Sequence, residues 1–138
     1  MEPHITVLTL GVRDLERSLG FYRDGLGLPT EGIVGTEFED GAVVFFELAG
    51  GLKLALYPRD ALAKDARAPI GPPGPASFSI GHNVGSNREV DVLMRDAERA
   101  GATIAVPPRD TFWGGYAGYF RDPDGNSLEL IMRGSWGF

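Results

Sequence analysis

The stretch that decides the fold is Gly118-Tyr-Phe-Arg-Asp-Pro-Asp-Gly-Asn-Ser-Leu-Glu-Leu-Ile131. Its centre, Asp122-Pro-Asp-Gly-Asn126, has the residues of a tight turn, because proline presets φ, aspartate bonds to nearby backbone and glycine accepts positive φ. Apolar residues flank the turn on both sides, so the stretch predicts a β-hairpin. Glu129 interrupts the apolar second strand, and a carboxylate there costs stability unless it faces solvent or a site. Where Glu129 points is therefore the main question that the sequence raises.

The bulk properties are those of one globular domain. A chain of 138 residues can bury a real core, and 43% hydrophobic with 23% charged residues is an ordinary globular composition. A net charge of -6 without a basic run disfavours a nucleic-acid partner. The sequence shows no signal peptide, no bilayer-length apolar run and no cysteine. We therefore expect a cytoplasmic protein without membrane or nucleic-acid partners.

The two halves of the sequence repeat one pattern, a strand, a helix and three strands. Asp14 caps the first helix, and Ser86-Asn-Arg-Glu89 is a capping box for the second. Leu8 corresponds to Ile80 and Leu54 to Leu128, so the halves are offset by 72 (80 − 8) to 74 (128 − 54) residues. The strands predicted from apolar alternation and turn residues are 4–12, 33–38, 42–48 and 52–57, then 77–84, 103–106, 116–121 and 127–132.

This repeat predicts an α+β fold. Two tandem βαβββ modules, each with a helix on one sheet face, are expected to form a curved, barrel-like mixed sheet around a central cavity. Module one spans 1–58, a Pro/Gly-rich connector spans 59–75, and module two spans 76–138, all within a single domain. The alternative is a coincidence of strand spacing, against which the agreement in helices, caps and hairpins argues.

Three stretches carry a family resemblance. They are Leu10-Gly-Val-Arg-Asp-Leu-Glu-Arg-Ser-Leu-Gly-Phe-Tyr-Arg-Asp-Gly-Leu-Gly-Leu28, Glu89-Val-Asp91 with Ala100-Gly-Ala102, and Asp122-Pro-Asp-Gly-Asn-Ser-Leu-Glu-Leu130. In them the chain resembles the vicinal oxygen chelate (VOC) superfamily of glyoxalase I, extradiol dioxygenases, bleomycin-resistance proteins and fosfomycin-resistance enzymes. The resemblance covers nearly the whole chain and implies the glyoxalase/bleomycin resistance/dihydroxybiphenyl dioxygenase fold and a homodimer. Its motifs are caps, turns and core positions, so they are specific for fold and weak for reaction.

The resemblance also implies where a metal would bind. Metal-dependent members of the superfamily hold a divalent ion with side chains from the first and last strands of each half. The corresponding positions are Val7, Ala55, Ser79 and Glu129. Valine and alanine have no donor atom and a serine hydroxyl is a poor ligand, so only Glu129 is competent. We expect a degenerate metal site and no cofactor, with a bound divalent metal as the alternative.

The two histidines could support a displaced metal site. Strand alternation points His82 away from the cavity, so we expect it to pack under the second helix with a backbone hydrogen bond. His4, near the terminus, is expected to be exposed to solvent. A β-bulge would reverse either assignment.

Other residues could line a ligand pocket. The segment Thr111-Phe-Trp-Gly-Gly-Tyr-Ala-Gly-Tyr119 can lay aromatic rings over a flat ligand, or it can seal one end of the sheet. Lys53 and Tyr57 share a strand face with Ala55 and could bind an anion or move a proton, or lie solvated at the rim. Phe45 and Phe46 fall on opposite sheet faces, so one of them should line the cavity. The expected ligand-binding residues are Val7, Thr9, Phe46, Lys53, Ala55, Tyr57, Ser79, Trp113, Tyr116 and Tyr119.

Three functions remain open at this point. The first is metal-independent binding of a small aromatic or carbonyl-containing molecule, as in bleomycin-resistance proteins. The second is a glyoxalase-type lyase or isomerase with Glu129 as general base, with or without a divalent metal. An extradiol dioxygenase is less expected, because it needs an iron triad. The third is a structural role for Glu129, hydrogen-bonded across the pseudo-twofold, in a protein that acts through a partner. A homodimer is expected as well.

Overall fold

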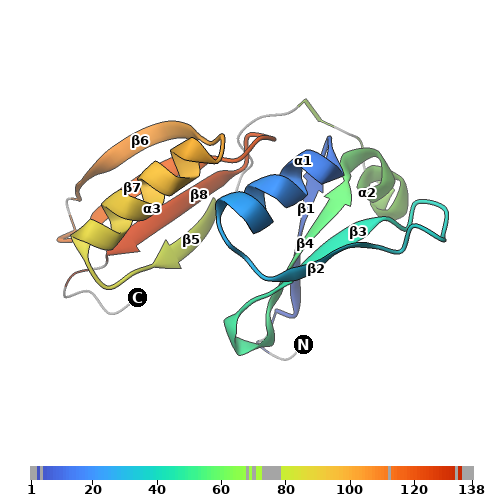
Figure 1. The fold of residues 1–138 in the computed structure, drawn as a ribbon, viewed down its shortest axis with the longest axis horizontal. Coiled ribbons are helices and arrows are strands. Elements are labelled where there is room, and N and C mark those ends of the chain that lie inside the picture. The colour runs from blue at the N-terminus through green and yellow to red at the C-terminus, as the bar shows by residue number, and fades with distance from the viewer. Residues whose placement is uncertain are drawn as a thin grey trace. The chain divides into compact units, whose positions relative to one another are not determined.

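The computed structural model describes residues 3, 5–67, 69, 71–72, 79–111, 113–132 and 134. The chain divides into two compact units, Met1–Pro72 and Pro73–Phe138, and each contains its own four-stranded sheet (Figure 1). The boundary between the units falls inside the connector predicted at 59–75.

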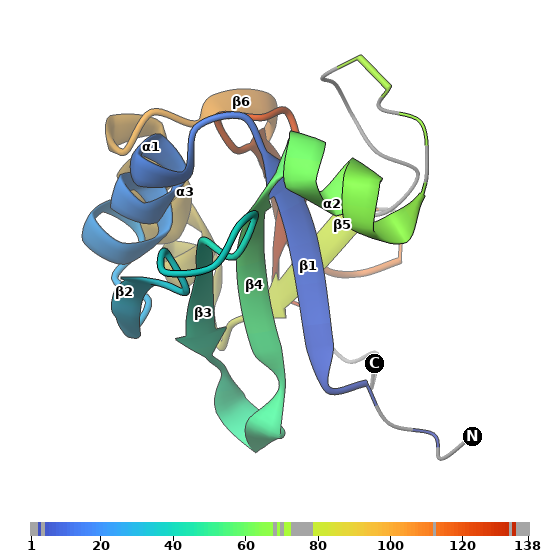
Figure 2. The same ribbon diagram turned by 90° about the vertical axis from the view of Figure 1, so that its right-hand side faces the viewer.

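The first unit has the predicted strand, helix and three strands, followed by a further helix. Its elements are β1 (Val7–Val12), α1 (Leu15–Leu19), the π-helical segment η1 (Gly20–Gly25), β2 (Thr30–Val34), β3 (Val43–Glu47), the 3-10 turn η2 (Ala49–Gly51), β4 (Lys53–Pro58) and α2 (Arg59–Ala66). The sheet order is β1-β4-β3-β2, with β1 parallel to β4 and the other pairs antiparallel. Figure 2 shows β1, β4 and β3 side by side, with α2 next to β1.

The second unit repeats this topology. Its elements are β5 (Ser79–Asn83), α3 (Asn87–Arg99), β6 (Thr103–Asp110), β7 (Tyr116–Arg121) and β8 (Ser127–Met132). The sheet order is β5-β8-β7-β6, with β5 parallel to β8 and the other pairs antiparallel. Helix α3 lies across β6, β7 and β8 (Figure 1). The two equal strand orders confirm the predicted pair of βαβββ modules and the mixed sheets.

Each sheet buries one face under the helix that follows its first strand. In the first unit the Tyr22 ring of η1 lies 5.9 Å from the Phe46 ring of β3, centroid to centroid. In the second unit α3 buries Val90, Met94 and Ala97. We call the opposite face of each sheet, turned away from α1 or from α3, its reverse face. The buried strand residues under α1 and η1 are Leu10, Val12, Val44, Phe46, Leu54 and Leu56.

Helix caps form where the sequence predicts them. The Asp14 carboxylate accepts a hydrogen bond of 3.1 Å from the backbone N–H of Arg17. Ser86 Oγ accepts from the Glu89 N–H at 3.1 Å, and the Glu89 carboxylate reaches back to the N–H of Gly85 at 3.2 Å. These bonds satisfy backbone donors that the first helical turn leaves open, and each such cap stabilises its helix by about 1 kcal/mol.

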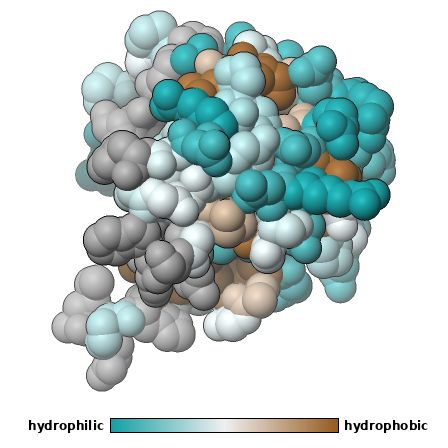
Figure 3. Space-filling model, turned by 90° about the vertical axis from the view of Figure 1, so that its left-hand side faces the viewer, coloured by the Kyte–Doolittle hydropathy of each residue, from teal (hydrophilic) through white to brown (hydrophobic). Residues whose placement is uncertain are grey.

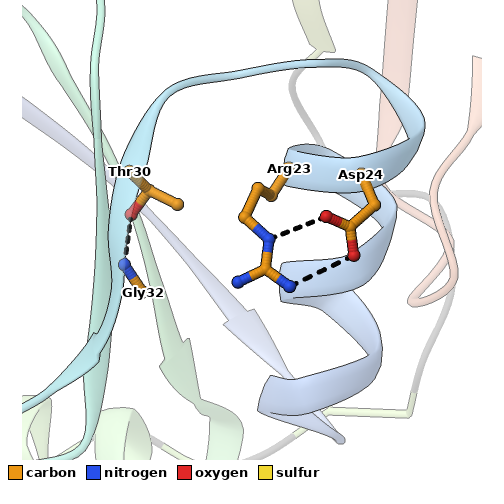
Figure 4. Close-up of polar contacts among 4 residues, drawn as sticks. All are labelled: Arg23, Asp24, Thr30 and Gly32. Carbon is orange, nitrogen blue, oxygen red and sulfur yellow. Dashed lines mark hydrogen bonds and ion pairs between the residues drawn. The ribbon is translucent and has the colours of Figure 1, made fainter.

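The end of η1 and the start of β2 are held by short-range polar contacts (Figure 4). Arg23 donates two hydrogen bonds to the Asp24 carboxylate, at 2.8 and 3.1 Å. The Thr30 hydroxyl accepts from the backbone N–H of Gly32 at 3.1 Å, and Gly32 has a φ of 90° that favours glycine. The sequence predicts a strand at 33–38, but β2 spans 30–34, because Gly35 has a φ of 79° and the chain turns after it, with the Phe38 N–H donating to the Gly35 carbonyl.

The sequence does not predict helix α2 of the first unit. It packs against β1 and β4, and a Cβ added to Gly11 would lie 3.2 Å from side-chain atoms of both Arg59 and Leu62. Glycine at that position lets the helix approach the strand closely. Residues 59–66 are good helix formers, but the prolines and glycines that follow indicated a connector throughout.

The turn between β7 and β8 has a single organising group, the buried Asp122 carboxylate. It accepts hydrogen bonds of 2.9 Å from the backbone N–H groups of Asp124 and Asn126 and from the Asn126 side chain. Gly125 has the expected positive φ, 87°. The predicted hairpin at β7 and β8 is confirmed, with β8 spanning the predicted residues 127–132.

The described residues include no helix that is long and apolar enough to cross a membrane. The face in Figure 3 is mostly hydrophilic, and its hydrophobic areas are small and separated. Large exposed apolar side chains among the described residues lie in the first unit: Ile5, Val7, Val34, Phe38 and Phe45.

Candidate functional site

The second unit contains a pocket of about 300 Å³ on the reverse face of its sheet. Glu129 lies at this pocket, half-buried, so the carboxylate that interrupts β8 faces a possible binding site and not the helix-covered core. Strand β6, the loop after it, and strands β7 and β8 supply the lining residues: Val106, Arg109, Asp110, Thr111, Trp113, Ala117, Tyr119 and Glu129.

Glu129 has two polar neighbours on its sheet. Tyr119 is its cross-strand partner in the β7–β8 register, and Ser79 of β5 also reaches the Tyr119 phenol. Burial raises the pKa of Tyr119, the charge of Glu129 and hydrogen bonding to its carboxylate raise it further, and the Ser79 hydroxyl opposes them. Tyr119 is therefore a neutral phenol near pH 7, able to donate a hydrogen bond beside a carboxylate that accepts one.

The loop between β6 and β7 positions Trp113. The Thr111 N–H donates to the Gly115 carbonyl at 2.9 Å, and the Gly115 N–H donates to the Thr111 hydroxyl at 2.9 Å. A Cβ at Gly115 would collide with the Trp113 ring, so the indole lies directly over the Gly115 backbone. The glycine that the sequence places in this segment is thus what allows the ring to reach the pocket.

Arg109 is a pocket residue that the sequence argument missed. The sequence predicts that the strand at 103–106 ends before Pro107 and Pro108, but β6 continues to Asp110 and pairs Arg109 with Ala117. β6 is an edge strand of its sheet, where a missing backbone N–H can face outward and proline is tolerated. The sequence alone does not show that this strand lies at a sheet edge, so it gave no signal that the strand continues through the two prolines.

Tyr116 lies on the opposite face from the pocket. Its hydroxyl donates a 2.7 Å hydrogen bond to Asp91 of α3, and this bond, together with burial and the charges of Asp91 and Asp110, raises the pKa of Tyr116. Strand alternation explains the placement, because Tyr116 and Tyr119 are three residues apart in β7. Of the aromatic residues predicted in this segment, the structure brings Trp113 and Tyr119 to the pocket and leaves Tyr116 against the helix.

In the first unit, the predicted positions on β1 and β4 share the reverse face of their sheet. Thr9 is the direct partner of Ala55, and Val7 is the partner of Lys53. Val7 is 44% exposed, whereas Ala55 is only 2% exposed. Neither Val7 nor Ala55 offers a polar atom on its side chain.

The two polar residues predicted on β4 have partners within the first unit. Lys53 forms an ion pair of 3.1 Å with Glu47, its cross-strand neighbour, and its ammonium lies 5.9 Å from the Phe45 ring centroid. The Tyr57 hydroxyl donates to the backbone carbonyl of Asp40. These contacts attach β4 to its neighbouring strand and to the loop before β3.

Phe46, predicted among the pocket residues, lies on the helix-covered face. It is fully buried beside Tyr22, whereas Phe45 is 40% exposed and is the cross-strand partner of Ala55 on the reverse face. The correction follows from strand parity, because adjacent residues point to opposite faces and the sequence alone does not say which face the helix covers.

His82 also differs from its prediction. It is exposed, not packed under the second helix. β5 is an edge strand that pairs only with β8, and α3 lies over β6, β7 and β8. His4 lies outside the described residues.

The side chains at the four family metal positions do not fit a four-ligand metal site. Val7 and Ala55 carry no donor atom, and Ser79 offers only a hydroxyl beside the Glu129 carboxylate. Within the part of the chain that the structure describes, no three histidine, cysteine, aspartate or glutamate side chains come together as a metal cluster.

The chain belongs to the Glyoxalase/Bleomycin resistance protein/Dioxygenase superfamily, whose family model matches residues 3–130. A glyoxalase-related enzyme from Fulvimarina pelagi is 30% identical, with 99% of this chain and 98% of that one covered and a TM-score of 0.82. A glyoxalase/bleomycin resistance protein/dioxygenase from Nocardioides is 26% identical, with 99% of this chain and 87% of that one covered and a TM-score of 0.78. A lactoylglutathione lyase from Agrobacterium tumefaciens is 26% identical, with 100% of this chain and 99% of that one covered and a TM-score of 0.70. No curated protein matches the chain.

Proposed function

We propose that this protein binds a small aromatic or carbonyl-containing molecule in the pocket of its second unit, without a metal ion. The observation that carries the proposal is that Trp113, Tyr119 and Glu129, from one loop and two strands, line the same pocket. Membership of a superfamily that includes bleomycin-resistance proteins supports it. The missing donor atoms at Val7 and Ala55 support the metal-independent form.

The pocket offers complementary contacts for such a ligand. The Trp113 ring provides a flat apolar surface, the Tyr119 phenol a hydrogen-bond donor and the Glu129 carboxylate an acceptor. A volume of about 300 Å³ is at the lower end for small-molecule sites, so a compact ligand of one or two rings is favoured.

A thermal-shift screen tests this function. Metabolites and planar aromatic compounds are added to the protein with and without a divalent metal, because a ligand that binds the folded state raises the unfolding temperature. We expect compact planar compounds to raise it equally in EDTA and in added metal. A shift that requires the metal, together with one tightly bound divalent ion per chain by elemental analysis, would contradict the metal-independent form.

A second candidate function is a glyoxalase-type lyase or isomerase. It is favoured by the Tyr119–Glu129 pair, and two similar structures are named as a glyoxalase-related enzyme and a lactoylglutathione lyase. In this reading Glu129 removes a proton from a carbon beside a carbonyl group. The single O–H of the neutral Tyr119 phenol, which bonds to Glu129 in the free protein, turns to the carbonyl oxygen of the substrate as negative charge develops there.

The substitution Glu129→Gln tests the second candidate. It keeps the shape of the side chain and removes the base, so turnover should fall by about 100-fold or more while the fold and ligand binding persist. Glu47→Gln is the matched control, because Glu47 is an exposed strand glutamate in the other unit. Unchanged turnover in Glu129→Gln would eliminate this mechanism and leave the binding function standing.

A further inference from the structure

The pocket has one cationic side chain among its lining residues, that of Arg109, and it is exposed. Trp113 and two carboxylates, Asp110 and Glu129, line the same pocket. Among the residues that the structure describes, none forms an ion pair or hydrogen bond with the Arg109 guanidinium. Asp110, the next residue of β6, also lines the pocket but forms no ion pair with Arg109.

A second arginine lies further along the same face. Arg121 is two residues beyond Tyr119 in β7, so strand alternation places both side chains on the reverse face. The Arg121 Nε is buried and has no hydrogen-bond partner within the described part of the chain. A buried donor without a partner is costly. Because this Nε is shielded from solvent, Arg121 contributes its positive charge to the face and not a direct hydrogen bond from that atom.

The pocket carries charges of both signs. Its carboxylates are Asp110 and Glu129, and Glu129 already interacts with Tyr119. Arg109 is its cationic lining residue, and the complement of an exposed guanidinium without an ion pair is an anion.

We propose that the ligand of this pocket is an organic carboxylate, whose acid group pairs with Arg109 while its planar body lies against Trp113. The inference rests on the proposed binding function and adds the chemical class of the ligand. A carboxylate matches the fork of guanidinium donors with two parallel hydrogen bonds, which a neutral amide cannot do. Arg121 reinforces the preference through its positive charge further along the face.

Matched pairs of acids and amides test the proposal by isothermal titration calorimetry. The probes are 4-hydroxybenzoate against 4-hydroxybenzamide and 2-naphthoate against 2-naphthamide, which differ in charge but hardly in shape. Because a charge-assisted hydrogen bond is strong, the acid of each pair should bind the natural protein about tenfold more tightly, or better. The preference should be lost in Arg109→Gln, partly kept in Arg109→Lys, and reduced less in Arg121→Gln.

Arg88→Gln is the matched control, since Arg88 is an exposed arginine of α3 outside the pocket and its loss changes the net charge equally. This control should keep the full acid preference. Equal binding of acid and amide to the natural protein would overturn the inference while leaving the binding function intact. An acid preference that survives in Arg109→Gln would also overturn it. If neither member of any pair binds, and the wider screen finds no ligand, the proposed function fails and the inference fails with it.

Discussion

The same backbone position carries different chemistry in the two units. In the first unit β3 and β4 pair Phe45 with Ala55, and in the second unit β7 and β8 pair Tyr119 with Glu129. The strand orders and hydrogen-bond registers correspond, but Ala55 is 2% exposed, whereas Glu129 is half-buried at a pocket. The repeat thus supplies two equivalent frameworks, and side-chain identity at matched positions places the polar site in only one of them.

The hairpin turns before these two positions differ in the same way. The turn before β4 relies on the backbone freedom of glycine, with φ of 77° at Gly50 and 83° at Gly51. The turn before β8 relies on the Asp122 carboxylate and its hydrogen bonds, with one glycine at positive φ, Gly125. In the second unit, side-chain hydrogen bonds therefore fix the turn that leads into the pocket strand β8. In the first unit, the corresponding turn forms because glycine can adopt positive φ.

Transferring the second unit's carboxylate to the first should have the largest effect. Ala55→Glu places a carboxylate at a nearly inaccessible position, so the free energy of unfolding should fall by about 3 kcal/mol or more. Urea unfolding monitored by circular dichroism measures it. Ala49→Glu, at an exposed residue of the neighbouring turn, should change stability by less than about 0.5 kcal/mol. A loss below 1 kcal/mol in Ala55→Glu would mean that the two positions are not distinguished by burial.

Removing the Asp122 carboxylate from the turn before β8 should cause the second-largest loss of stability. Asp122→Ala deletes the acceptor of three hydrogen bonds and should cost about 2–3 kcal/mol, because buried donors lose their partner. Asp122→Asn keeps one acceptor oxygen and should cost less. In the first unit, Gly50→Ala should cost only about 1 kcal/mol, the penalty for a left-handed conformation. Equal losses in Asp122→Ala and Gly50→Ala by chemical denaturation would remove the proposed difference between the turns.

A methyl group at Gly115 should cost about 1–3 kcal/mol and also displace Trp113. The indole would have to leave the Gly115 backbone, so Gly115→Ala should lose the thermal shift given by any planar ligand of the pocket. Gly118→Ala is the control in the adjoining strand, where the added Cβ points to the helix face and meets the flexible end of Met94 at 2.9 Å and the backbone N of Pro108 at 3.2 Å. It should cost stability while leaving Trp113 in place. Retained ligand binding in Gly115→Ala would show that Trp113 is not part of the binding surface.

The smallest expected effect concerns the pocket tyrosine. Glu129→Gln removes the negative charge that helps to raise the pKa of Tyr119, so this pKa should move down towards its ordinary value. NMR of 13C-labelled tyrosine measures the shift, and the Tyr119→Phe variant assigns the signal. An unfolded tyrosine ionises near pH 10. Because the folded pKa is higher, the contribution of Tyr119 to stability is complete below pH 10 and declines as pH rises above it. An unchanged Tyr119 pKa in Glu129→Gln would contradict their interaction.

Much of the fold was predictable because its signals are local. Asp14, Ser86 and the turn at Asp122 are short-range hydrogen-bonding motifs that the sequence displays directly, and all three form as predicted. The helix α2 and the continuation of β6 through two prolines were missed. Both depend on parts of the chain that are distant in sequence. Helix α2 needs a strand to pack against, and β6 can contain prolines because it lies at an unpaired sheet edge. The expected homodimer and cytoplasmic location stay predictions.

The candidate site was predictable only in part. The sequence singled out Glu129, Tyr119 and Trp113, and the structure brings these three to one pocket. It assigned Phe46 to the wrong sheet face and did not consider Arg109. The alternation of side chains along a strand separates its two faces but does not say which face a helix covers. Phe46 and Tyr116 both lie on the helix-covered face, so neither reaches the pocket.

By itself, the sequence determined the repeated βαβββ order, the caps and the turn that aligns β7 with β8, because caps and turns are settled by residues within a few positions of one another. Only the tertiary structure decided that Glu129 faces a pocket with Tyr119 and Trp113, and that Arg109 joins them from an edge strand. Those neighbours come from separate strands and a loop, so their approach depends on pairing and helix packing across the whole unit, which local sequence does not specify.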